Sequence, residues 1–326
     1  MSTTQDYANR TDLSALNEAV ENIKSELGKM IIGQSNMVEM LITALLANGH
    51  VLIEGVPGVA KTLTAKLLAR TISVGFSRVQ FTPDLLPSDV LGTSIFDPKS
   101  LVFTFKKGPI FGNLVLVDEI NRAPAKTQAA LFEVMEERQV TVDGISYQME
   151  KPFLVLATQN PVEHEGTYRL PEAQLDRFLF KILVDYPTPD EEVQILSGFH
   201  TRLGINDISA LTPLLSGEQV QNLQKVVQSL HVEDKILRYM AQLTTATRNN
   251  PALYLGASPR ASLALLTGSK ALAAIRGRDF VTPEDVQTVA YPVLRHRIQL
   301  SPEREMEGST PDQVIKSLIE KIEVPR

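Results

Sequence analysis

Hydrophobic and polar positions change period several times along the first part of the chain. Between residues 13 and 27 the apolar side chains recur at three- and four-residue spacing, which predicts an amphipathic helix. A second helix is expected over residues 36–47. Residues 51–53 form a short apolar run, which predicts a buried strand, and helical character returns over residues 62–72.

Three further apolar runs lie downstream, over residues 79–81, 114–117 and 153–157. Helix-like segments separate these runs. Buried strands that alternate with helices are typical of a parallel sheet with helices on both faces. We therefore expect a doubly wound α/β domain.

Two segments interrupt this alternation with patterns typical of β-hairpins. Over residues 93–107, two β-rich stretches flank the turn-forming cluster Asp97–Ser100. Over residues 140–149, apolar and polar residues alternate on both sides of Asp143-Gly144, a strong signal for a two-residue turn. We expect two β-hairpin inserts in the α/β domain.

The pattern changes again at the two prolines of Tyr186-Pro187-Thr188-Pro189, where strand-like runs stop. We assign residues 1–187 to N-terminal helices and the α/β domain, and residues 188–326 to a helical linker and a smaller all-α lid domain. Within the lid, one helix is expected over residues 262–275. Another begins at Thr282-Pro283, because threonine is a good N-cap and proline suits the first helical position.

Composition then narrows the class of protein. The chain has 326 residues, of which 43% are hydrophobic and 21% charged, as in an ordinary globular protein. The absence of cysteine excludes disulfides, thiolate metal sites and cysteine nucleophiles. The formal net charge of -6 argues against a general nucleic-acid binder, whose binding surface is usually basic.

The N-terminal residues are polar and lack the apolar core of a signal peptide. The longest apolar stretch, around residues 40–47, is far shorter than the ~20 residues that span a bilayer. We therefore expect a soluble, cytoplasmic protein without a membrane span.

A glycine-bearing loop follows the strand predicted at residues 51–53. Its sequence, GVPGVAKT, matches the P-loop pattern G-x-x-x-x-G-K-[ST], except that Ala60 replaces the second glycine, a mild change because alanine has the next smallest side chain. In such loops backbone N–H groups surround the β-phosphate, the lysine contacts the β- and γ-phosphates, and the hydroxyl ligates Mg²⁺. Taken alone, the loop could instead be a structural turn with an exposed lysine. The residues expected to bind nucleotide are Gly55, Val56, Pro57, Gly58, Val59, Ala60, Lys61, Thr62 and Leu63.

Two acids, Asp118 and Glu119, follow the apolar run at residues 114–117. Carboxylates at the C-terminal end of a parallel strand face the crevice where α/β sheets bind ligands. In a P-loop site, Asp118 would hold Mg²⁺ through water and Glu119 would polarise the attacking water. An apolar strand followed by two acids is common by itself, but together with the P-loop it predicts an ATPase that uses ATP and Mg²⁺.

At this point the sequence resembles the AAA+ superfamily and, within it, the MoxR family. The resemblance covers roughly residues 30–289 and includes Ala60, which is usual in that family. It rests on five motifs in the family's order: GVPGVAKT (55–62), DEINRAP (118–124), ATQNP (157–161), LPEAQLDRF (170–178) and GASPRA (256–261).

The resemblance implies roles for further residues. Ile32, Gly33 and Gln34 look like the segment that contacts adenine. Asn160 looks like the sensor-1 residue, which orients the water together with Glu119; a structural asparagine before a proline is the alternative.

Four arginines bear on the resemblance. Arg177 resembles the arginine finger that reaches the γ-phosphate of a neighbouring subunit, although by itself it also fits a surface salt bridge. Arg122 and Arg169 could share that role. Arg260 looks like sensor 2, and a cation at a helix start is disfavoured unless an anion lies nearby.

The two hairpins also fit the resemblance, which implies that both face the pore of a ring. Phe103 and Phe105 on the first hairpin, or Tyr147 on the second, could contact a substrate, and packing against the core is the alternative. Glu163-His164-Glu165 has no spaced partner ligands, so we interpret it as a solvated loop and not as a metal site.

The function expected from the resemblance is Mg-dependent ATP hydrolysis that drives chaperone-like remodelling, assembly or metal-cofactor maturation of a partner complex. The chain would form a homo-oligomer, a hexameric ring, and act on a client protein together with a von Willebrand factor A-domain partner. The ATPase motor subunit of a metal chelatase is the alternative. A nucleic-acid-remodelling ring is a further alternative, against which the acidic net charge argues.

Overall fold

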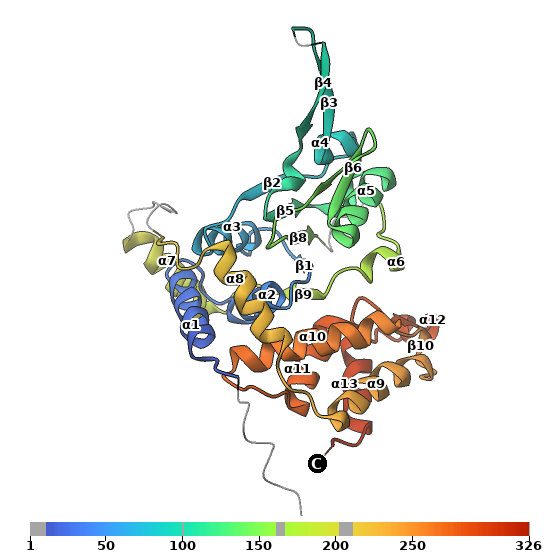
Figure 1. Cartoon of the computed structure of the whole chain (residues 1–326). Helices are drawn as coiled ribbons and strands as arrows, with labels where there is room; N and C mark the ends of the chain where they lie inside the picture. The colour runs from blue at the N-terminus through green and yellow to red at the C-terminus, as the bar shows by residue number, and fades with distance from the viewer. Residues whose placement is uncertain (1–10, 100, 161–166, 202–210, 326) are drawn as a thin grey trace, which may run out of the picture. The chain divides into compact units, whose positions relative to one another are not determined.

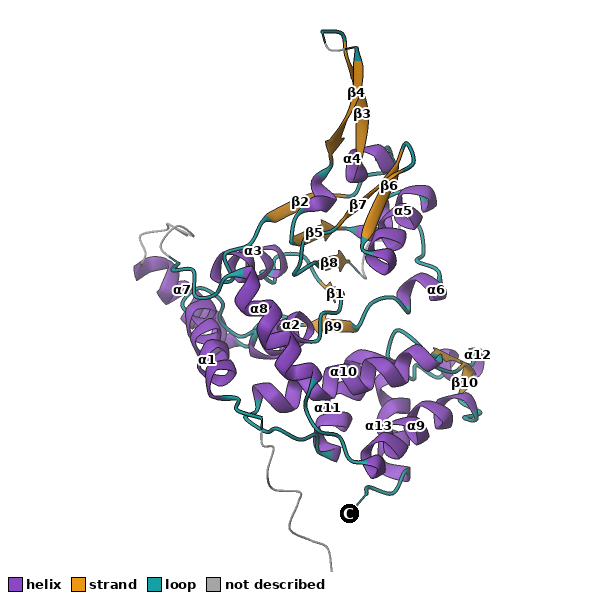
Figure 2. Cartoon of the chain, viewed as in Figure 1, coloured by secondary structure: helices purple, strands orange, loops and turns teal. Residues whose placement is uncertain are grey.

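The computed structural model of the chain describes residues 11–99, 101–160, 167–201 and 211–325. By internal contacts the chain divides into two compact units, Ile23–Gln221 and the remainder. The first, called the sheet unit below, contains every strand of the central sheet, and the second, called the lid unit, is mainly helical (Figures 1 and 2). Within the described part of the chain, no helix is long and apolar enough to cross a membrane.

The sheet unit is built on five strands in the order β2-β5-β8-β1-β9, all parallel. The strands are β1 (Val51–Gly55), β2 (Phe76–Gln80), β5 (Leu114–Asp118), β8 (Leu154–Gln159) and β9 (Phe180–Val184). β5 is buried along its whole length, as its uninterrupted apolar sequence predicts for a central parallel strand. The predicted doubly wound α/β fold is therefore confirmed.

The edge strand β9 was not predicted from the sequence. It carries Lys181 in its apolar run and exposes Leu183, so it lacks the continuous burial that marks β1, β5 and β8. Lys181 Nζ lies 2.9 Å from a carboxylate oxygen of Glu54 on β1. β9 is thus placed by pairing with β1 and by this ion pair, neither of which the local hydrophobic pattern shows.

The three helices predicted over residues 13–27, 36–47 and 62–72 are present, and further helices follow along the chain. The two N-terminal helices and the helix after the phosphate loop are α1 (Ser14–Gly28), α2 (Ser35–Leu46) and α3 (Lys61–Thr71). The others are α4 (Pro87–Leu91), α5 (Ala125–Glu137), α6 (Glu172–Leu175), α7 (Pro189–Thr201) and α8 (Gly217–Gln228), with 3₁₀ turns η1 (Pro109–Phe111) and η2 (Ile120–Arg122). The division between the two units falls within α1 and α8.

Both predicted hairpins are present. β3 (Gly92–Asp97) pairs with β4 (Val102–Lys107), and this ribbon projects from the sheet unit (Figure 1). β6 (Gln139–Val142) pairs with β7 (Ile145–Gln148). The second turn has positive φ at both Asp143 (51°) and Gly144 (78°), the geometry of the type I′ turn that Asp-Gly favours.

Aromatic side chains distinguish the base of the first hairpin from the part nearer its turn. The rings of Phe105 and Tyr147 lie 4.6 Å apart between centroids, and Phe105 also contacts Phe111. The ring of Phe103 instead packs against Phe96 of the same hairpin, and Phe103 stays 67% exposed. Phe105 and Tyr147 therefore join the two hairpins as half-buried side chains, whereas Phe103 is available for contact.

The lid unit is helical, as expected, with one addition. Its helices are α9 (Asp234–Arg248), α10 (Pro259–Ile275), α11 (Pro283–Leu294), α12 (Pro302–Met306) and α13 (Pro311–Lys321). A short antiparallel pair, β10 (Leu253–Leu255) and β11 (Gln299–Leu300), corrects the all-α expectation. Such short strands are set by pairing between distant segments, so local patterns do not reveal them.

The helix predicted to start at Thr282 begins with a capping box. The Thr282 N–H and hydroxyl both donate to Asp285 Oδ2, at 3.0 and 3.1 Å.

The domain boundary that the sequence predicts near residue 187 stays a prediction. By contacts, residues 188–221 belong to the sheet unit, where Leu214 N–H donates to the Thr71 carbonyl.

A buried histidine joins three elements of the sheet unit. His50 Nδ1 accepts from the Val155 N–H at 2.9 Å, so the neutral ring carries its proton on Nε2 and donates to the Met135 carbonyl at 3.0 Å. Burial, with a smaller effect from the nearby Arg138 cation, lowers the pKa of His50 to about 3. His50 is therefore a neutral structural residue.

We expect the free energy of unfolding to fall between pH 7 and pH 5. Because the folded-state pKa of His50 lies below its ordinary value of 6.5, the stabilising contribution is complete above pH 6.5 and is lost as the pH falls towards 3. About 2 kcal/mol should be lost through this residue by pH 5. Urea unfolding at both pH values measures the change, and His50→Gln, which does not titrate, should show a smaller one. Equal changes in the two proteins would contradict this role.

Candidate functional site

The phosphate loop connects β1 to α3 and has an unusual backbone. Gly58 and Ala60 both have positive φ, at 87° and 61°. Alanine in place of the usual glycine therefore costs conformational energy at position 60 in spite of its small side chain, because the left-handed region costs a residue with a Cβ about 1–2 kcal/mol. Strain of this kind is typical of functional loops. The Lys61 ammonium donates to the Gly55 carbonyl, which folds the lysine back over the loop.

Gly55 ends β1 and has to be glycine for a different reason. A Cβ at this position would lie 2.5 Å from the carbonyl oxygen of Val184, the residue opposite it on β9. The glycine therefore lets β9 approach the start of the phosphate loop.

The two acids lie at the end of β5, as predicted. Asp118 is buried, and Glu119 follows it with a positive φ of 56°. Thr158 of β8 joins them: its hydroxyl donates to Asp118 Oδ1 and accepts from the Glu119 N–H, both at 3.1 Å. Thr158 was not found from the sequence, although it precedes Asn160 by two residues and so lies on the same face of the strand.

Strand β2 adds two side chains that were also missed. Arg78 Nε donates to Asp118 Oδ2 at 2.6 Å, and Gln80 Nε2 donates to Glu119 Oε2 at 2.7 Å. Residues two apart on a strand share a face, and Gln80 is the register partner of Asp118. The only available signal was this cross-strand register, which requires knowing that β2 and β5 are neighbours.

These groups line one cavity of about 380 Å³. Its described walls come from the phosphate loop, β2 and the ends of β5 and β8: Pro57, Gly58, Ala60, Lys61, Thr62, Leu63, Arg78, Gln80, Asp118, Glu119, Thr158 and Asn160. Residues from β2, β5 and β8 thus meet the phosphate loop at the carboxyl edge of the sheet, where α/β folds bind ligands.

The oxygen donors in this cavity suit Mg²⁺. The Thr62 hydroxyl and the Asp118 carboxylate are hard ligands, the type that this cation prefers. Among the described residues no group of three His, Cys, Asp or Glu side chains could hold a metal by itself. That arrangement fits magnesium, which is usually bound through one or two carboxylates together with substrate phosphates.

The segment expected to contact adenine lines a second cavity, of about 460 Å³, with Gly33 and Gln34 among its walls. Gln34 Nε2 donates to the Asp185 carbonyl at 3.1 Å. The described lining residues of this cavity and of the phosphate-loop cavity do not overlap. Arg260 is the second residue of α10 and belongs to the lid unit.

The three candidate arginines lie in different environments. Arg122 Nε is 3.0 Å from Glu119 Oε2. Arg169 is 83% exposed along its side chain, 3.5 Å from Glu172. Arg177 is 29% exposed, donates to the Phe132 carbonyl of α5 and lies 3.9 Å from a carboxylate oxygen of Glu136. It does not line the phosphate-loop cavity. The Glu163-His164-Glu165 segment lies outside the described residues.

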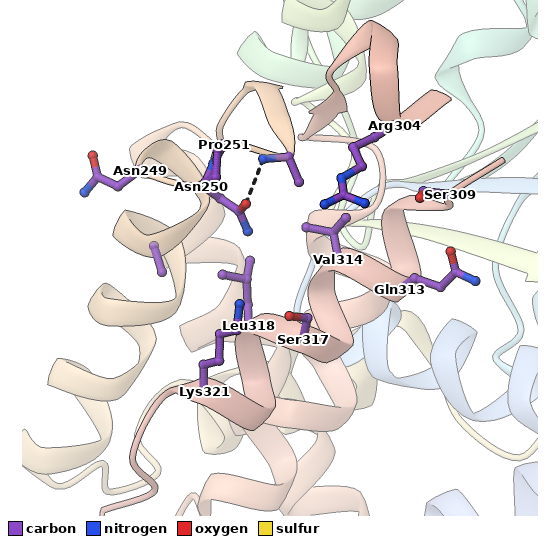
Figure 3. A pocket seen from close by; sticks show the side chains of 12 residues that line it. Asn249, Asn250, Pro251, Arg304, Ser309, Gln313, Val314, Ser317, Leu318 and Lys321 are labelled. Carbon is purple, nitrogen blue, oxygen red and sulfur yellow. Dashed lines mark hydrogen bonds between the residues drawn. The ribbon is translucent and has the colours of Figure 1, made fainter. Parts of the chain in front are cut away.

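The lid unit contains its own cavity, of about 530 Å³, between the end of α9, α12 and α13 (Figure 3). The side chains of Asn250, Arg304 and Lys321 point towards it, and Asn250 Oδ1 accepts from the Ala252 N–H at 2.9 Å. Among the described residues, its lining has amides, hydroxyls and two cations.

Comparisons with known proteins agree with this geometry. The family described as "ATPase family associated with various cellular activities (AAA)" matches residues 50–180, and "AAA lid domain" matches residues 245–318. The Bacillus subtilis protein YeaC, described as uncharacterized, is 46% identical and covers 95% of each chain. Chaperone MoxR1 of Mycobacterium tuberculosis is 44% identical over 96% of this chain and 84% of its own. The crystal structure of an ATPase candidate from Cytophaga hutchinsonii superposes with a TM-score of 0.89 at 40% identity, over 96% of this chain and 97% of that one.

The parallel sheet, the phosphate loop and the two acids define an AAA+ ATPase with a helical lid. Within that class, the chain belongs to the MoxR family.

Proposed function

We propose that this chain forms a homo-oligomeric ring in which Mg-dependent ATP hydrolysis drives chaperone-like remodelling of a partner protein. The observation that carries the proposal is the gathering of Lys61, Thr62, Asp118, Glu119 and Asn160 around one cavity. These are the groups that bind phosphates, ligate a metal and activate water in P-loop ATPases.

Each residue in the cavity has a separate task. The N–H groups at the start of α3 and the Lys61 ammonium bind the β- and γ-phosphates. Thr62 and Asp118 would hold Mg²⁺, which neutralises charge on the phosphates. Thr158 keeps Asp118 oriented through its hydroxyl.

Glu119 is the proposed general base. Its carboxylate accepts from Gln80 and lies beside the Arg122 guanidinium. Both contacts hold the carboxylate in place, and from there it would accept a proton from water. Asn160, which lines the same cavity, would orient that water.

Arg177 is proposed to complete the site of a neighbouring subunit. It is excluded from the cavity of its own chain, yet its side chain is partly exposed at the surface next to α5. A guanidinium supplied in trans neutralises charge on the transferred phosphoryl group. Arg260 would sense nucleotide from the lid, and Ile32, Gly33 and Gln34 would contact adenine.

The exposed part of the first hairpin is the proposed contact for the client. Phe96, Leu101, Val102 and Phe103 are all exposed on it, an unusual concentration of large apolar side chains. The relative named Chaperone MoxR1 supports a chaperone-like role. A hexameric ring and a von Willebrand factor A-domain partner are further parts of the proposal that rest on family resemblance.

Affinity capture with Glu119→Gln tests this function, because slow hydrolysis should prolong the ATP-bound ring. We expect a defined partner protein to be retained with ATP and released with ADP. The double variant Glu119→Gln/Phe103→Ser, which lacks one exposed aromatic ring, should retain several-fold less of the partner protein. Retention that is the same with ATP and ADP, and the same with and without Phe103, would contradict the proposal.

A further inference from the structure

Both oxygens of the Asp118 carboxylate are already engaged by side chains. Oδ1 accepts from the Thr158 hydroxyl at 3.1 Å, and Oδ2 accepts from Arg78 Nε at 2.6 Å. The Asp118 side chain is only 8% exposed, whereas that of Arg78 is 53% exposed. The guanidinium therefore covers the solvent side of a carboxylate that is otherwise buried in the sheet.

A divalent cation at Asp118 competes directly with Arg78. The two positive charges repel, and both require electron pairs of the same carboxylate. Mg²⁺ also demands near-ideal octahedral geometry, whether the carboxylate binds it directly or through a bound water. The short Arg78–Asp118 contact thus competes with the use of Asp118 as a metal ligand.

Arg78 has a second anion available once nucleotide binds. It lines the same cavity as Lys61 and Thr62, where the phosphates are expected. A guanidinium is well suited to phosphate because its N–H groups match two oxygens at once. Since Arg78 is half exposed and lies on the edge strand β2, its side chain has room to turn from Asp118 to the phosphates.

We propose that Arg78 is a positioning residue that withholds Asp118 from a divalent cation alone and releases it when nucleotide phosphates draw the guanidinium away. The metal ion and the nucleotide then bind together, so that neither the charge of the metal nor that of the phosphates is left uncompensated. This inference rests on the proposed function, in which the cavity takes Mg-ATP. Gln80 holds Glu119 from the same strand, so β2 controls both acids.

Binding of Mn²⁺ without nucleotide, followed by electron paramagnetic resonance of the free ion, tests the inference. We expect the wild-type protein to bind Mn²⁺ weakly and Arg78→Gln to bind it at least tenfold more tightly, with one site per chain. Adding Asp118→Asn to Arg78→Gln should abolish that site. Arg78→Lys keeps a positive charge beside Asp118 and should restore weak binding.

Arg70→Gln is the matched control, because it removes an exposed arginine of α3 that does not line the cavity. It should bind Mn²⁺ as the wild-type protein does. Equal Mn²⁺ affinity in the wild-type protein and Arg78→Gln, with both folded by circular dichroism, would overturn the inference. A different result would show that the proposed function is wrong. If the cavity does not take Mg-ATP, Asp118→Asn should leave the binding of Mn-ATP unchanged.

Discussion

Replacing Arg177 by alanine should lower the rate of ATP hydrolysis by about 10³–10⁵-fold, the range found for arginine fingers in NTPases. Arg177 lies outside the cavity of its own chain, so it is not expected to contribute to ATP binding there. The loss should therefore fall on kcat, with little change in the affinity for ATP. Steady-state hydrolysis and equilibrium binding of ATP measure the two quantities separately.

Mixing two inactive variants distinguishes a role in trans from a structural one. Arg177→Ala keeps an intact Glu119, and Glu119→Gln keeps an intact Arg177. In mixed rings, some sites combine the intact Glu119 of one subunit with the intact Arg177 of its neighbour. We expect activity well above the sum of the separate variants. Activity equal to that sum would contradict the intersubunit role.

Two further substitutions decide which arginine acts in trans. Arg169 is highly exposed and Arg122 is paired with Glu119, so each provides a distinct alternative. If Arg169→Ala rather than Arg177→Ala proves to be rescued by mixing, the role belongs to Arg169. If Arg122→Ala lowers the rate of ATP hydrolysis and mixing restores it, the role likewise belongs to Arg122.

Glu119→Gln should reduce kcat by about 10²–10⁴-fold, the range typical of a lost general base. The amide matches the carboxylate in size and its oxygen can still accept from Gln80, so ATP affinity should change little. Single-turnover hydrolysis measures the chemical step directly. Glu133→Gln, which removes an exposed acid of α5, is the control and should behave as the wild-type protein. Turnover of Glu119→Gln near the wild-type rate would show that another group activates the water.

The parts of the site found from the sequence are those that lie together in the chain. Lys61 and Thr62 follow β1 directly, and Asp118 and Glu119 follow the apolar run of β5. Each could be recognised because a buried strand leads into it. Ala60 shows the limit of this approach: its identity was readable, but its left-handed backbone was not.

Residues that act across strands could not be found in the same way. Arg78, Gln80 and Thr158 contact the two acids from β2 and β8, and nothing in their own segments marks them. The same applies to the edge strand β9, whose place beside β1 depends on pairing.

The sequence by itself determined the alternation of buried strands with helices, the phosphate loop, the acid pair and both hairpins, because hydrophobic period and turn residues act over short chain distances. Only the tertiary structure decided which side chains hold the acids and which hairpin aromatics pack between the hairpins or stay exposed. Strand order and register bring residues forty positions apart, such as Arg78 and Asp118, into hydrogen-bonding distance. These depend on how the strands pair and pack, and packing is a property of the whole fold and not of any one segment.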